Sequence, residues 1–151
     1  MIRDDLKAAL TAAMKSGDKA RTGTIRLIQA ALKNRDIELR GSSGAPADDD
    51  VLVTEVLQKM IKQRRESIAM YEQGGRAELA EAEAAEVAVI EAFLPRQMDE
   101  AELAAAIDAI VAETGASSVK DMGKVMAALR ERHAGEVDMA KASSAVKARL
   151  G

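Results

Sequence analysis

The chain lacks cysteine and tryptophan, and its 151 residues include one tyrosine, one phenylalanine and one histidine. The absence of cysteine excludes disulfides, thiolate nucleophiles and zinc sites with cysteine ligands. The scarcity of aromatic residues disfavours a core of β-sheet, because strands prefer such residues. No apolar run approaches the roughly 20 residues of a membrane span, and residues 1–5 do not resemble a signal peptide. We therefore expect a soluble, cytosolic protein without a membrane role.

Hydrophobic residues nevertheless make up 48% of the chain, and nearly all are Ala, Leu, Val, Ile or Met, which suit packed helices. Helical spacing of these residues predicts four helices in the first part of the chain. Helix breakers and acidic first turns set their limits. The predicted helices cover residues 2–16, a stretch from Gly17–Asp18 to about 40, a stretch from Asp48–Asp50 to about Gln73, and a fourth ending near Leu94. The segment from Gly41 to Pro46 reads as a loop.

A second set of helices follows Pro95, which disfavours helical backbone in the residue before it. Asp99 and Glu102 are spaced as an acidic capping box, and Gly115 is a helix stop. Gly135 and Asp138 divide the remainder into two further helices. The fold class predicted is all-α, with a four-helix bundle-like N-terminal domain at residues 1–95 and a small three-helix tail domain at residues 99–151.

The segment 115–126 is the one that is patterned to meet a ligand. Ser118 and Asp121 are spaced as a helix cap, which would point the amides of the first turn outward. The following helix has a cationic strip opposite an apolar strip. The cationic strip consists of Lys120, Gly123, Lys124 and Ala127. Residues 114–151 contain seven basic and four acidic side chains, although the whole chain has a net charge of −3. This tail could bind a polyanion, but any capped amphipathic helix also exposes lysines to water.

Several segments resemble the GatB/YqeY family, whose small YqeY-like members are similar to the C-terminal tail of the B subunit of the aspartyl/glutamyl-tRNA amidotransferase. The likeness is strongest at residues 115–126 and extends over nearly the whole chain. The other similar segments are Ala12–Lys15 with Asp18–Lys19, Ile25–Ile28, Lys62–Ser67 and Phe93–Met98. The chain departs from the family at Gly135–Met139, where an acid, Glu136, replaces the usual lysine and the second glycine is missing.

The resemblance implies a tRNA-binding accessory protein, without chemistry of its own, that supports an aminoacyl-tRNA synthetase or an amidotransferase. The implied RNA-binding residues are Ser117, Ser118, Lys120, Gly123 and Lys124. Two other classes stay open. One is an enzyme, a carbon–nitrogen ligase with glutamine as amide donor, although no nucleophile or ATP-binding loop is evident. The other is a helical protein-interaction module.

No catalytic residue, metal site or cofactor is predicted, and neither DNA nor a membrane is an expected partner. His133 lies near a helix C-terminus, where a cation is favourable, so a role as base or metal ligand is the weaker reading. Asp48–Asp50 fit a helix start better than a magnesium site. Arg64 falls on an apolar stripe, where pairing with Glu83 or Glu86 is preferred over contact with RNA.

Overall fold

The computed structural model describes residues 1–41, 44 and 48–151, so that most of the predicted Gly41–Pro46 loop lies outside the described residues. All regular elements in the described residues are helical, which confirms the all-α class. None of the helices in those ranges combines the length and apolar character that a membrane span requires. The described residues form two compact units, residues 1–94 and 95–151.

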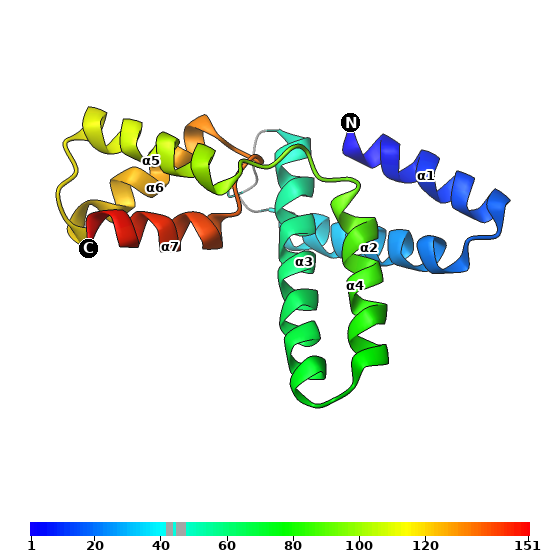
Figure 1. Cartoon of the computed structure of the whole chain (residues 1–151). Coiled ribbons are helices and arrows are strands. Elements are labelled where there is room, and N and C mark those ends of the chain that lie inside the picture. The colour runs from blue at the N-terminus through cyan, green and yellow to red at the C-terminus, as the bar shows by residue number, and fades with distance from the viewer. Residues whose placement is uncertain (42–43, 45–47) are drawn as a thin grey trace. The chain divides into compact units, whose positions relative to one another are not determined.

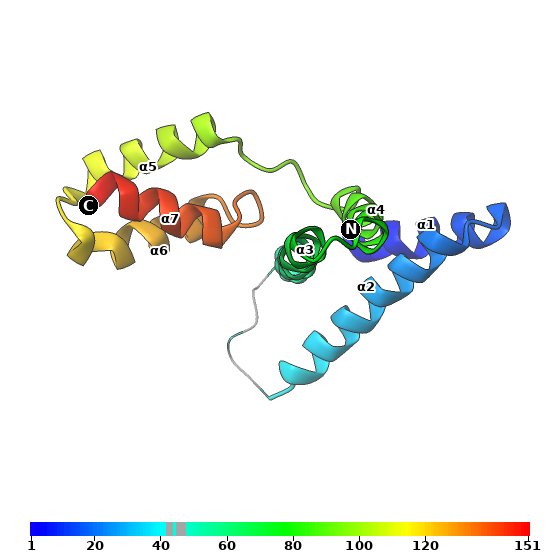
Figure 2. The ribbon, with the colours of Figure 1, turned by 60° about the horizontal axis from the view of Figure 1, so that its bottom comes forward.

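The first unit contains α1 (Ile2–Ser16), α2 (Lys19–Glu38), α3 (Asp49–Gln73) and α4 (Ala77–Glu91). Figures 1 and 2 show α3 and α4 side by side as one hairpin, and α1 and α2 as another. Between α1 and α2, Gly17 adopts a left-handed φ of 73°, and the Asp18 carboxylate then accepts a hydrogen bond from the Arg21 N–H. A core of aliphatic side chains, including Ile25, Ile28 and Leu57, joins the two hairpins.

Two details of the first unit agree with the predictions from the sequence, and one differs from them. Arg64 lies within 2.9 Å of the Glu86 carboxylate, as the apolar stripe predicted. Asp48 caps α3 by accepting the Asp50 N–H. Helix α4, however, ends at Glu91 rather than near Leu94. Ahead of Pro95 the backbone tightens, and the Leu94 N–H donates to the Glu91 carbonyl three residues back.

The second unit contains α5 (Glu100–Thr114), a 3₁₀ turn η1 (Val119–Asp121), α6 (Met122–Arg132) and α7 (Met139–Leu150). The capping box predicted at Asp99 and Glu102 is present, and Gly115 ends α5 with a left-handed φ of 69°. Asp138 caps α7. The three helices share a separate core of ten buried residues, among them Ile107, Val125 and Val146. This core includes buried side chains of α6, whose exposed face is described next.

Candidate RNA-backbone site on the tail

The predicted cationic strip forms one exposed face of η1 and α6. Lys120, Gly123, Lys124 and Ala127 are all exposed. Directly beneath them, the side chains of Val125 and Leu129 are fully buried in the core of the second unit. Helical spacing therefore places this face as the sequence predicted, and the buried floor gives it a fixed backbone.

Ser118 stands at the predicted N-cap position, but the capping hydrogen bond expected from its hydroxyl is absent. Ser118 has extended backbone and its side chain makes no capping hydrogen bond, while a 3₁₀ turn precedes α6. The Asp121 carboxylate instead accepts the Ser117 N–H at 3.0 Å. The hydrogen bond from Ser117 is the main reason why the pKa of Asp121 lies below its ordinary value, and the Ser118 amide and the Lys124 charge lower it further. The Ser117 amide is thus occupied by Asp121, and the Asp121 N–H donates to the Ser118 carbonyl rather than to the Ser118 hydroxyl, so these two amides are not free for a ligand.

Gly123 is the feature of this face that internal packing does not explain. Its φ is not left-handed, and a Cβ placed on it would meet nothing within 4 Å. An alanine would therefore fit, and within a helix it would be more stable than glycine by roughly 0.5–1 kcal/mol. The glycine leaves the backbone open between two lysines, as the close approach of a ligand would require.

The strip carries an excess of positive charge. Two cations of the tail are paired across helices, Arg132 with Glu113 and Arg149 with Asp108. By contrast, Lys120, Lys124 and Arg130 have no ion pair within the described ranges. Arg130 extends the predicted strip beyond Ala127. It lies seven residues after Gly123 and is exposed, so the same helical spacing could have identified it.

Other candidate residues have structural partners. The His133 ring lies 3.2 Å from the Glu136 carboxylate. The Glu136 carbonyl accepts the Met98 N–H, and the Gly135 carbonyl accepts from the Gln97 side chain, so the turn that departs from the family holds residues 97–98 in place. In the first unit, Asp49 pairs with Arg3 and Asp50 accepts the Ile2 N–H. The described residues contain no cluster of three metal-ligating side chains.

Comparison with known proteins gives one family and several relatives. The family model described as Yqey-like protein matches residues 3–150. A protein named altered inheritance of mitochondria protein 41, mitochondrial, from Eremothecium gossypii is 37% identical over 72% of this chain and 58% of its own length. Proteins of the same name from Lachancea thermotolerans and Kluyveromyces lactis are 30% and 33% identical, over 72% and 58% of this chain and 57% and 45% of their own lengths.

The matched segment spans about half the length of these curated relatives. Their names place these relatives in the mitochondrion, which corrects the expectation of a cytosolic protein. That expectation came from the lack of a signal peptide at residues 1–5, an argument about secretion that cannot separate the cytosol from an organelle.

Proposed function

We propose that this chain, which belongs to the YqeY-like protein family, is a tRNA-binding accessory protein whose tail holds the sugar-phosphate backbone of folded tRNA. The observation that carries the proposal is the open backbone at Gly123 between the exposed side chains of Lys120 and Lys124. Lysines bind phosphates as point charges, and an uncovered backbone permits close approach.

The chemistry of the strip favours backbone contact over base recognition. Tyr71 and Phe93 both lie outside the tail, so the tail has no Phe, Tyr or Trp on which splayed bases would stack. In this proposal the two lysines neutralise phosphates and the hydroxyls of Ser117 and Ser118 contact phosphate or sugar oxygens. An aminoacyl-tRNA synthetase or an amidotransferase would be the enzyme that receives the tRNA.

Filter binding of tRNA to the full chain at several salt concentrations tests this function. If the tail neutralises roughly three or four phosphates, it should contribute about −2 to −3.5 to the slope of log affinity against log salt. The variant Lys120→Ala/Lys124→Ala should make the slope shallower by about 1 to 2. Gly123→Leu should weaken binding while the helix content seen by circular dichroism is retained.

Equal tRNA affinity of the double-lysine variant and the parent would remove the tail from the binding site. The helical protein-interaction module would then be the better reading. A matched control is Lys141→Ala/Lys147→Ala, which removes two exposed lysines of α7 and the same net charge. This control should change the slope less than the variant of the strip.

A further inference from the structure

A second cationic surface lies on the first unit, along the outer seam between α1 and α2. Two shallow cavities of about 220 and 330 Å³ follow this seam. The first lies between the start of α1 and the last turns of α2, and the second between the end of α1 and the first turns of α2. On α2 the lining residues of both cavities recur at intervals of no more than four positions, and on α1 Lys7 and Met14 are seven positions apart, so one face of each helix is involved.

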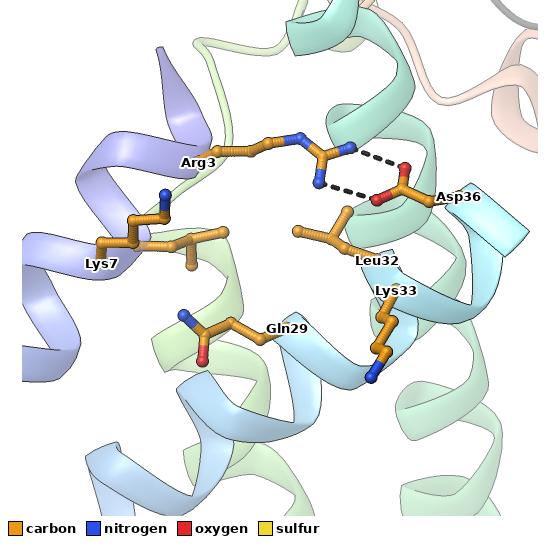
Figure 3. A pocket seen from close by; sticks show the side chains of 7 residues that line it. Arg3, Lys7, Gln29, Leu32, Lys33 and Asp36 are labelled. Carbon is orange, nitrogen blue, oxygen red and sulfur yellow. Dashed lines mark hydrogen bonds and ion pairs between the residues drawn. The ribbon is translucent and has the colours of Figure 1, made fainter.

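One end of the seam is closed by an ion-pair network. The Arg3 guanidinium reaches from α1 to Asp36 of α2 in a bidentate pair at 2.8 and 3.1 Å, and also contacts Asp49 at 2.9 Å. The hydrogen bond to Asp36 raises the pKa of Arg3 above its ordinary value. Figure 3 shows this pair, with Lys7, Gln29 and Lys33 on the seam beside it. Arg3 thus neutralises the acidic side chain that lines the cavity.

The remaining charged side chains that line the seam are all cations. They are Lys7, Lys19, Arg26 and Lys33. All four are exposed, and none has an ion pair with any residue in the described ranges. Arg26 contacts the Met14 sulfur at 3.5 Å, which leaves its charge uncompensated. Asp4 and Asp5 are the acidic residues nearest to Lys7 in sequence, and both lie in the first turn of α1.

Gly23 leaves helix backbone exposed beside cations on this seam, as Gly123 does on the tail. Among the described residues, Gly23 in α2 and Gly123 in α6 are the two glycines that lie within a helix. Both are exposed, and a Cβ added to either would meet nothing within 4 Å. Each also has cations nearby in the chain: Lys19 and Arg26 lie four and three residues from Gly23, and Lys120 and Lys124 lie three and one residues from Gly123. Since neither glycine is required by backbone geometry or packing, both keep a patch of backbone open beside positive charge.

The arrangement of the cations fits a polymer rather than a small anion. Lys19, Arg26 and Lys33 follow one another every seven residues, about 10 Å apart along α2 for each step at 1.5 Å per residue. A phosphorylated metabolite would need them to converge, whereas a phosphodiester chain presents repeated charges. A docking protein helix would need a row of apolar anchors, but Leu6 and Leu32 are 1% and 3% exposed, and Met14, at 49%, is the one large apolar side chain of the two cavities that is open to solvent.

We propose that the α1–α2 seam is a second binding surface for an RNA sugar-phosphate backbone, with Lys7, Lys19, Arg26 and Lys33 neutralising phosphates beside the open backbone of Gly23. The identity of the RNA as tRNA rests on the proposed function, but the seam itself does not depend on the tail. Gln29 supplies a side-chain amide for sugar and phosphate oxygens on the same face, whereas the Thr22 hydroxyl donates to the Asp18 carbonyl.

Three double-lysine variants of the full chain test the seam at equal net charge: Lys19→Ala/Lys33→Ala on the seam, Lys120→Ala/Lys124→Ala on the tail, and Lys59→Ala/Lys62→Ala on the exposed side of α3 as control. Affinity for tRNA and for duplex DNA of similar length is measured from about 50 to 200 mM salt. The seam variant should lose roughly tenfold in tRNA affinity and make the slope shallower by about 2, and the control should stay near the parent.

A seam variant that binds tRNA like the α3 control would overturn the proposal, whatever the tail variant does. Loss in the seam variant with no loss in the tail variant would keep the seam and reject the tail as the site of the proposed function. An equal loss for duplex DNA would overturn the assignment to RNA. As a second test, Gly23→Gln should weaken tRNA binding severalfold at unchanged helix content. The control Ala85→Gln, at an exposed position of α4, should leave tRNA binding unchanged.

Discussion

Among single residues, Asp121 has two opposing effects on the tail. Its carboxylate accepts the Ser117 N–H and so stabilises the turn into α6, but it also places a negative charge beside Lys124. Asp121→Asn keeps an acceptor oxygen and removes the charge. We expect this variant to bind tRNA severalfold more tightly than the parent at low salt, since phosphates are no longer repelled. Salt-dependent filter binding checks this, and weaker binding would show that the carboxylate is needed to shape the site.

The same variant should alter the dependence of stability on pH. The folded pKa of Asp121 is lowered, so its carboxylate stabilises the fold above the unfolded pKa, near 3.9, and this stabilisation is lost as pH falls through the folded value. Parent and Asp121→Asn should therefore differ most in urea stability near neutral pH. The difference should vanish at the acid end of the curve. A constant difference over the whole range would exclude the charge as its cause.

At the scale of helices, α3 and α4 carry two ion pairs that differ in burial. Arg64 and Glu86 are 15% and 33% exposed, whereas Arg65 and Glu91 are 51% and 45% exposed. Double-mutant cycles with Arg→Met and Glu→Gln should give a coupling of about 1.5–3 kcal/mol for the first pair and about 0.2–1 kcal/mol for the second. Urea unfolding measures both. Equal couplings would show that burial does not strengthen the Arg64 pair.

Helix limits were the most predictable part of the fold, because single residues determine them. Gly17, Gly115, Asp99 and Asp138 mark ends or caps through local geometry, and local geometry can be read from sequence. The hydrogen bond expected from the Ser118 hydroxyl is absent because the chain enters α6 through a 3₁₀ turn, in which the Asp121 N–H donates to the Ser118 carbonyl instead. The choice between these two acceptors depends on how the turn folds.

The tail strip and the α1–α2 seam differ in predictability for a related reason. The strip lies on one helical segment, so its spacing alone placed Lys120, Gly123 and Lys124 on one face. The seam combines Lys7 of α1 with Lys33 of α2, and helical periodicity does not say which faces of two helices meet. Gly23 had a sequence signal, a glycine inside a predicted helix, but only the structure showed that packing does not require it.

At the scale of the whole molecule, each compact unit has its own core, and the two cores should unfold separately. Ile28 is 0% exposed in the first core and Ile107 is 1% exposed in the second. The second unit is short, and small domains bury a modest fraction of their surface, so it should melt at the lower temperature. Calorimetry of the full chain should therefore show two transitions.

Conservative truncations assign the two transitions. Ile→Val in a core typically costs about 0.5–1.5 kcal/mol, and about 1 kcal/mol lowers the Tm of a domain of 60–100 residues by roughly 4–8 °C. Ile107→Val should lower only the first transition, and Ile28→Val only the second. A single transition that both substitutions lower equally would mean that the two cores unfold as one cooperative unit. In that case a fragment of residues 95–151 could not be expected to bind tRNA by itself, and the tail strip would have to be studied in the full chain.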